Sequence, residues 1–255
     1  MIPKRIDPGA GHGGSLDLAF KTYTYSACES GFAEHDLDEY DPVAESLAFT
    51  RTLATLRRAF RIDLEATSVV EKTRDAWVDA TLKPKAGEGV GATPQKYLRP
   101  YAHILHIPTL TGGIGSKDLA KFYTEFFTPA SLPPSFTSKL LSRTLGTDRV
   151  VDELHISFTH THPITWLLPE IPPTNKAVEV AVVSIMCVRG GKLESERLYW
   201  DQGSVLVQIG LIDASYVPGK WKQKGVKRLP LVGVEGARAV RRGGSREINF
   251  LVEGW

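Results

Sequence analysis

Apolar and polar residues follow two different periods along the chain, and the period changes near residue 134. Over residues 41–60 apolar side chains recur every three or four positions, which predicts a helix with Asp41 as its N-cap. The same spacing predicts a second helix around 69–77 and a third over 116–127, with Ser116 as its cap. The first half of the chain is therefore expected to be mainly helical.

After that point the pattern becomes that of β-strands separated by turn residues. Helices first and an antiparallel meander afterwards predict an α+β fold, with helices packed on one face of a curved sheet. The expected strands are 135–146, 148–162, 176–190 and 192–202, with turns at 146–148, 172–175 and 189–192.

Alternation within the second of these strands separates an inner face from an outer face. The inner series is mostly apolar and ends at His160, which is therefore expected to point into the covered side of the sheet. A hydrogen-bonded core histidine is the alternative interpretation of His160. His155 has the opposite parity and is expected to be solvated. The inner series consists of Val150, Asp152, Leu154, Ile156, Phe158 and His160.

One aspartate interrupts the apolar run LYWDQGSVLVQIG at 198–210. Asp201 lies between Trp200 and Val205, so we expect it to be partly desolvated and suited to exchange a proton near neutral pH. The alternative is that Asp201 caps the helix that follows.

Composition excludes several classes of function. The chain has 255 residues, a formal net charge of +2 and two distant cysteines, which indicates a globular protein of a reducing compartment, the cytoplasm by default. No secretory signal or membrane span is expected, and nothing in the charge balance indicates a nucleic-acid or membrane partner. The basic run at 220–228 could dock a partner, but it is also typical of a solvated loop.

Motifs for covalent, phosphoryl-transfer or hydride-transfer chemistry are missing. The glycine-rich stretches at 9–14 and 111–115 lack a preceding strand and a GK[ST] ending respectively, and there is no GxSxG elbow. Two histidine pairs, His103 with His106 and His160 with His162, have spacings that can chelate a metal. No acidic second shell accompanies them, so neither a metal nor a cofactor is predicted.

Four segments of the chain resemble the SnoaL-like branch of the NTF2-like superfamily, in particular its longer, fungal-type members. The resemblance spans residues 21 to about 213. It implies an N-terminal extension (1–38), a cone-shaped domain (39–213) with an inserted loop at 83–100, and a C-terminal extension (214–255). The segments are KTYTYSACESGFAEHDLDEYDPVAESL, HIPTLTGGIGSKDLAKFYTEFF, SRTLGTDRVVDELHISFTH with LLPEIPPTNKAVEV, and RLYWDQGSVLVQIGL.

The resemblance also implies a site. In polyketide cyclases of this family an aspartate seven residues before Gln-Leu-Gly is the general acid/base, and Asp201 precedes Gln208 by seven. His160 then matches a pocket histidine and is its expected partner, and His106 is a second donor. Five aromatic residues are expected to line the pocket, or alternatively to pack in the core: Tyr101, Trp200, Phe122, Tyr123 and Trp166.

The function implied is that of a cofactor-independent cyclase or isomerase, acting by proton transfer on a hydrophobic polyketide-like or terpenoid secondary metabolite, in a homodimer. A non-catalytic binding or dimerisation module is the alternative. Some similar proteins carry a dienelactone hydrolase label. That activity is set aside, because the sequence has neither alternating βα units nor a nucleophile elbow.

Overall fold

The chain forms two compact units, residues 1–64 and 65–255, in a computed structural model that describes residues 23–25, 28–82, 94–241, 248–252 and 254. The first unit contains α1 (Pro42–Phe60), and the Asp41 side chain accepts hydrogen bonds from the first backbone N–H groups of this helix, as predicted. The glycine-rich stretch at 9–14 lies outside the described residues.

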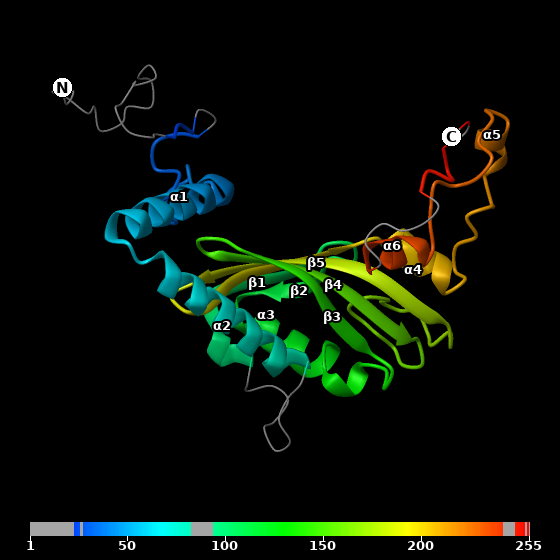
Figure 1. Cartoon of the computed structure of the whole chain (residues 1–255), viewed down its shortest axis with the longest axis horizontal. Coiled ribbons are helices and arrows are strands. Elements are labelled where there is room, and N and C mark those ends of the chain that lie inside the picture. Colours follow the sequence, from blue (N-terminus) through cyan, green and yellow to red (C-terminus); the bar gives the residue numbers. More distant parts are fainter. Residues whose placement is uncertain (1–22, 26–27, 83–93, 242–247, 253, 255) are drawn as a thin grey trace. The chain divides into compact units, whose positions relative to one another are not determined.

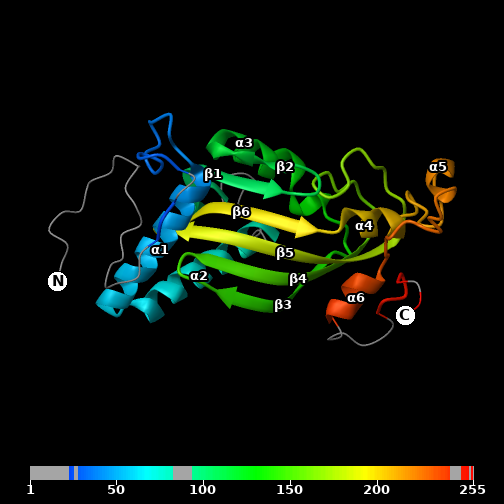
Figure 2. The ribbon, with the colours of Figure 1, turned by 90° about the horizontal axis from the view of Figure 1, so that it is seen from above.

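A six-stranded sheet forms the centre of the second unit, in the order β2-β1-β6-β5-β4-β3 (Figure 2). The four predicted strands are confirmed as β3 to β6, while β1 and β2 were not anticipated. The strands are β1 (Leu98–His106), β2 (Thr111–Ile114), β3 (Thr137–Leu145), β4 (Arg149–Thr159), β5 (Ala177–Arg189) and β6 (Lys192–Trp200).

The sequence pattern predicted a wholly antiparallel sheet, but one of the strand pairs is parallel. Strand β1 pairs with β6 in parallel, with His106 opposite Leu198, whereas the other four strand pairs are antiparallel. No turn connects β1 to β6, so their relative direction is set by the packing of the whole unit and not by local sequence.

The predicted turns depend on residues that tolerate a left-handed backbone. Gly190 and Gly191, with φ of 58° and 70°, close the hairpin between β5 and β6. Asn175, with φ of 56°, ends the turn before β5. Asparagine is among the non-glycine residues that adopt this conformation most readily.

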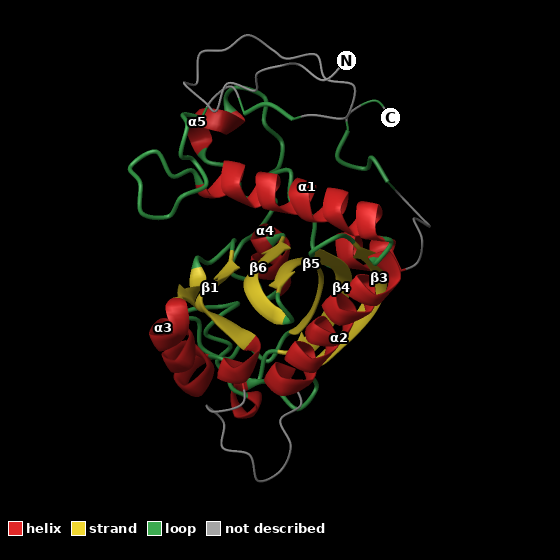
Figure 3. Ribbon diagram, turned by 90° about the vertical axis from the view of Figure 1, so that its left-hand side faces the viewer, coloured by secondary structure: helices red, strands yellow, loops and turns green. Residues whose placement is uncertain are grey.

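Helices cover the concave face of the sheet (Figure 3). These are α2 (Asp63–Leu82) and α3 (Gly115–Lys121), and α3 continues into a π-helical turn, η2 (Phe122–Phe126). Ser116 is not the cap of α3, because the helix begins at Gly115 without a side-chain cap. Residues 83–93 of the expected loop lie outside the described part, and its end is ordered as η1 (Pro94–Tyr97) and the start of β1.

The opposite face of the sheet is covered at one end by the C-terminal segment (Figure 1). Helix α6 carries Arg238, which pairs with Glu179 of β5, and Glu179 in turn contacts His155 at 3.1 Å. His155 is therefore buried, and the prediction that it is solvated was wrong. The helices of this segment are α4 (Gln202–Gln208), α5 (Gly219–Lys222) and α6 (Glu235–Arg241).

Strand β5 extends beyond β6, and a side chain completes its edge. Because β6 ends at Trp200, opposite Val182, the backbone of Glu179 has no strand partner on that side. The Gln208 amide fills this place: its Oε1 accepts from the Glu179 N–H and its Nε2 donates to the Glu179 carbonyl, both at 2.9 Å. Helix α4 is thereby fixed to the sheet.

The apolar core lies between the concave face of the sheet and α2 and α3. The predicted inner series of β4 is confirmed, since Val150, Asp152, Ile156 and Phe158 are buried at alternate positions of the strand, and His160, just after its end, is buried as well. Among the described residues, no helix combines the length and the apolar character needed to cross a membrane.

Candidate functional site

A cavity of about 570 Å³ lies between α2, η2 and the concave face of the sheet. Aromatic and aliphatic side chains make up most of its wall, and a smaller number of charged groups lie on one side. This combination is typical of small-molecule sites. The main apolar lining residues are Trp77, Tyr123, Phe127, Phe136, Leu154, Ile156, Trp166 and Leu198, and the polar ones that concern the chemistry are Arg74, His106, Arg143, Asp152 and Glu196.

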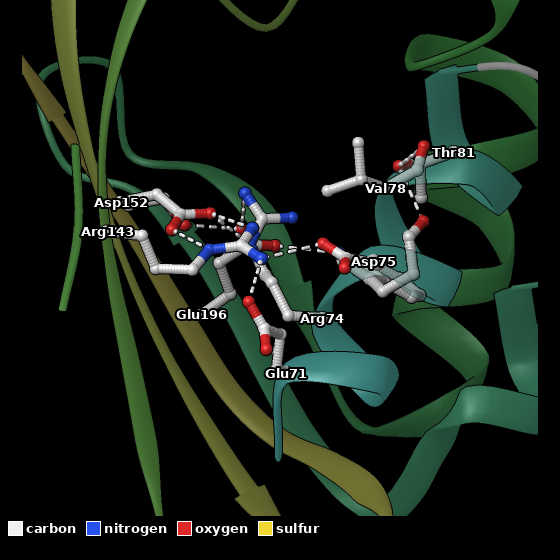
Figure 4. A network of polar contacts seen from close by, with 10 residues as sticks. Glu71, Arg74, Asp75, Val78, Thr81, Arg143, Asp152 and Glu196 are labelled. Carbon is white, nitrogen blue, oxygen red and sulfur yellow. Dashed lines mark hydrogen bonds and ion pairs between the residues drawn. The ribbon is translucent and has the colours of Figure 1, made fainter. Parts of the chain in front are cut away.

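Asp152 is the centre of the charged side of the cavity (Figure 4). Arg143 of β3 donates to it through Nε at 2.7 Å and through Nη2 at 3.0 Å, and Arg74 of α2 donates through Nε at 2.9 Å. The Asp152 hydrogen bond is the main reason why the pKa of Arg143 is raised. All three of these guanidinium hydrogen bonds end on Asp152, so both of its carboxylate oxygens are already occupied within the protein.

Glu196 of β6 is a second buried carboxylate whose oxygens are occupied. Trp77 Nε1 donates to its Oε2 at 2.9 Å, and Ser184 Oγ donates to its Oε1 at 2.7 Å. Because both oxygens already accept hydrogen bonds, Glu196 acts as a buried acceptor that fixes α2 to the sheet.

The charged side and the other side of the cavity are joined by one row of residues across the sheet. His106 pairs with Leu198, Leu198 with Ser184, Ser184 with Asp152 and Asp152 with Arg143. Residues directly opposite each other share a face of the sheet. Four strands separated by about 4.8 Å place the ends of the row from His106 to Asp152 roughly 14 Å apart at Cα.

His106 lies at the apolar end of this row and is 2% exposed. Burial lowers its pKa from 6.5 to about 4, so the imidazole is neutral at physiological pH. Its Nδ1 lies 2.8 Å from Thr111 Oγ1, and Thr111 Oγ1 donates to the Trp166 carbonyl at 3.0 Å. When the Thr111 hydroxyl hydrogen is donated to the Trp166 carbonyl, Thr111 Oγ1 can only accept from His106. In that arrangement Nδ1 carries the proton and donates to Thr111, and Nε2 is the basic nitrogen.

The free edge of the His106 ring faces aromatic surroundings. Its ring centroid is 5.2 Å from that of Trp166 and 5.5 Å from that of Phe122. Among the described residues Nε2 has no hydrogen-bond partner, and His106 lines the cavity. A neutral base with one fixed nitrogen and one nitrogen available to a ligand is the main chemical feature of this end.

Tyr123 lies between the two ends of the cavity. Its ring contacts those of Trp77 at 5.3 Å and Phe127 at 5.4 Å. Burial, and then the charge of Glu196, raise the pKa of Tyr123 well above its ordinary value. Its hydroxyl therefore stays protonated and can donate to an oxygen of a ligand.

Asp201 does not have the environment expected for it. Asp201 is exposed and is not among the residues that line the cavity, so the prediction that it is partly desolvated was wrong. It occupies the N-cap position of α4, but its side chain makes no capping hydrogen bond. The chain turns outward at the end of β6, which sequence alternation could not reveal.

His160 is fully buried but it is not among the cavity-lining residues. Its Nδ1 accepts from the Thr174 backbone N–H at 3.4 Å and lies 3.1 Å from Thr174 Oγ1, and burial lowers its pKa. Its backbone also pairs with Lys176 and Asn175. These contacts correspond to the alternative interpretation, that of a hydrogen-bonded core histidine, here holding the turn before β5.

The five aromatic candidates are divided by the structure. Tyr123 and Trp166 line the cavity, while Phe122 and Trp200 are buried beside the His106 ring and are not among the lining residues. Tyr101 is 87% exposed. It lies outside the pocket because its position in β1 has the parity opposite to that of the buried Ala102, Ile104 and His106.

Four charged residues of the cavity were not anticipated, although the sequence held signals for them. Asp152 belongs to the inner series of β4, and Glu196 shares its parity in β6 with the inward Leu198. Arg74 lies one helical turn after Val70 on the buried stripe of α2. An acidic residue within an inward apolar series is therefore the signal to follow. The sequence held no such signal for Arg143, because β3 is an edge strand whose residues do not alternate between buried and exposed.

His103 and His106, one of the two histidine pairs with chelating spacing, do not converge. His103 and His106 are three residues apart in β1, so they lie on opposite faces of the sheet. Within the ranges that the structure describes, no three or more His, Cys, Asp or Glu side chains gather in a metal-binding arrangement.

No family model and no curated protein matches this chain. Solved structures do match it. A putative SnoaL-like polyketide cyclase from Jannaschia sp. CCS1 is 16% identical, with a TM-score of 0.42 over 56% of this chain and 94% of its own. A ketosteroid isomerase-like protein from Catenulispora acidiphila is 15% identical, with a TM-score of 0.41 over 58% of this chain and 98% of its own.

A third match is AclR, a putative hydroxylase from Streptomyces galilaeus. It is 16% identical, with a TM-score of 0.43 over 62% of this chain and 94% of its own. All three structures are less than 25% identical to this chain and align with TM-scores below 0.5. At such identities they assign no activity, so the function is argued from the cavity itself.

Proposed function

We propose that this chain is an enzyme that moves a proton within a flat, largely apolar and oxygen-bearing small molecule, as a cofactor-independent cyclase or isomerase does. The observation that carries this proposal is His106: a buried, neutral imidazole with Nδ1 held by Thr111 and Nε2 available inside an apolar cavity. A base held in one orientation meets the geometric requirement of general acid/base catalysis.

The proposed step needs only a base and an oxygen donor. His106 Nε2 takes a proton from a carbon next to a carbonyl. The electron pair of the broken C–H bond forms the enolate double bond, and the π electron pair of the carbonyl moves to its oxygen. Tyr123 O–H donates to that oxygen. Return of the proton to another carbon gives an isomer. Attack of the enolate carbon on a second carbonyl closes a ring, and the new alkoxide takes the proton from His106.

Exchange of α-hydrogens in D₂O tests this proposal before the natural substrate is known. 6-Acetyl-2-tetralone is a suitable probe, because it is flat and largely apolar and carries an enolisable ring ketone remote from a second carbonyl. We expect the protein to accelerate loss of the α-proton NMR signal and His106→Gln to reduce that acceleration by about a hundredfold or more. His103→Gln, on the opposite face of β1, is the matched control. Exchange that is the same with and without protein would overturn the proposal.

A non-catalytic binding module is the second candidate. The hydrogen bonds that the two buried carboxylates already accept favour it. Asp152 and Glu196 already accept hydrogen bonds from Arg143, Trp77 and Ser184, so neither is available as a base. If 6-acetyl-2-tetralone binds in the cavity and its ring α-hydrogens do not exchange, the binding role is the correct one.

A further inference from the structure

One guanidinium in the cavity has donors that no described residue uses. The Arg74 side chain is 5% exposed and lines the cavity. Its Nε donates to Asp152, but its Nη2 lies 4.0 Å from Glu196 Oε1, which is too far for a hydrogen bond. Its Nη1 has no hydrogen-bond partner among the described residues. Figure 4 shows this group reaching from α2 towards Asp152 and Glu196.

The neighbouring Arg143 shows that such free donors are not a general property of the cluster. Its Nε and Nη2 donate to Asp152, and its Nη1 donates to Asp75 at 2.8 Å and to Glu71 at 3.3 Å. Each of its three nitrogens is therefore used within the protein. Arg143 ties β3 to α2, whereas the terminal nitrogens of Arg74 are left for another acceptor.

We propose that Arg74 binds a carbonyl oxygen at one end of the ligand, through its terminal Nη groups. A nearly buried guanidinium with unused donors gains hydrogen bonds only from something that enters the cavity. An sp² oxygen accepts two hydrogen bonds in the geometry that a guanidinium presents. This assignment depends on the proposed function in one respect: the ligand is taken to bind in the same cavity as His106.

The balance of charge favours a neutral carbonyl over a carboxylate. Arg74 and Arg143 are already balanced by Asp152 and Glu196, and the more exposed Asp75 adds a further negative charge at the same side. A ligand carboxylate would introduce another negative charge into a low-dielectric region. A ketone, ester or amide oxygen uses the free donors without that cost.

The two ends of the cavity then define a substrate class. Arg74 recognises a neutral carbonyl at the charged end, while the rings of the ligand extend along Trp77 and Tyr123 towards His106 at the apolar end. The reacting carbon lies at the His106 end. The substrate is therefore a flat, uncharged molecule of two or three rings with a carbonyl group remote from the carbon that loses its proton.

Three probes with one ring system separate the contribution of the oxygen from that of the rings. 2-Acetonaphthalene carries a neutral carbonyl, 2-naphthoate a carboxylate, and 2-ethylnaphthalene no oxygen. Their binding to wild type, Arg74→Lys and Arg99→Lys is measured by titration calorimetry. Arg99 is the matched control, because it pairs with Glu194 and does not line the cavity.

We expect wild type to bind the ketone about tenfold more tightly than the ethyl compound, and the carboxylate no better than the ethyl compound. Arg74→Lys should reduce the ketone preference to less than about twofold and leave ethylnaphthalene binding unchanged, whereas Arg99→Lys should change neither. Tighter binding of naphthoate than of the ketone, or a ketone preference that survives Arg74→Lys, would overturn the assignment.

A measurement on wild type alone covers the case in which Arg74→Lys does not fold. The carbonyl stretch of ¹³C-labelled 2-acetonaphthalene should shift to lower frequency when bound, and an unshifted band in saturated protein would contradict the contact. His106→Gln separates the two proposals: it should abolish α-hydrogen exchange and keep the ketone preference. Ketone preference without exchange in wild type would therefore reject the catalytic proposal and retain the Arg74 site.

Discussion

His106 and Asp152 lie on the same row across the concave face of the sheet, with Leu198 and Ser184 between them. His106 is neutral among aromatic rings, and Asp152 is paired with two guanidinium groups. The cavity above this row therefore has an apolar, basic end and a charged, hydrogen-bonding end. A ligand with one carbonyl terminus reaches the unused Arg74 donors in only one of its two orientations in this cavity.

The buried His106 should make the stability of the fold depend on pH. Its pKa is about 4 in the folded chain and near 6.5 when unfolded, so the unfolded state binds more protons between these values. Stability should consequently fall by about 3 kcal/mol as pH decreases from 7 to 4. His106→Gln should remove this component, and urea unfolding of both proteins across that pH range measures the difference. Parallel pH profiles would contradict the buried neutral imidazole.

Asp201→Asn distinguishes the sequence-based site from the structural one. The sequence resemblance implies loss of turnover of about a hundredfold, as for a general acid/base. Because Asp201 is exposed and lies outside the cavity wall, we expect α-hydrogen exchange to stay within about twofold of wild type. The same exchange assay, run beside His106→Gln, decides between them. A loss equal to that of His106→Gln would return Asp201 to the mechanism.

Asp152→Asn should strongly destabilise the fold, because it removes the negative charge and one of the two oxygens that accept from the two guanidinium groups. Breaking a buried pair by removing one partner typically costs about 3–5 kcal/mol. Glu153→Gln is the control: Glu153 is the next residue in β4, with its side chain on the other face. Denaturant midpoints of the two variants measure the difference, and equal midpoints would show that the network contributes no net stability.

Trp77→Phe removes the indole donor to Glu196 and keeps most of the aromatic packing. A hydrogen bond to a charged group contributes about 1.5–3 kcal/mol, so we expect a loss of stability in that range. Trp221→Phe, at a half-exposed position of α5, should change stability by less than about 0.5 kcal/mol. If the two variants unfold at the same denaturant concentration, the Trp77 hydrogen bond is not a stabilising contact.

Local patterns determined much of the fold. Alternation identified strands β3 to β6 and the inward face of β4, because a strand with one buried face must place apolar residues at every second position. The Asp41 cap and the glycine pair of the last hairpin were equally readable, since each depends only on neighbouring backbone. His106, Tyr123 and Trp166, which the resemblance assigned to a pocket, are among the residues that line the cavity.

Only the tertiary structure decided which of the candidate groups meet. The parallel pairing of β1 with β6 brings His106 onto the same row as Asp152, and nothing in the local sequence of either strand encodes that pairing. Burial of His155 under the C-terminal segment and exposure of Asp201 depend in the same way on where distant segments pack. The sequence by itself determined the periods, caps and turns, which are local. Long-range packing decided which side chains share a cavity, because burial and charge pairing arise between residues far apart in the chain.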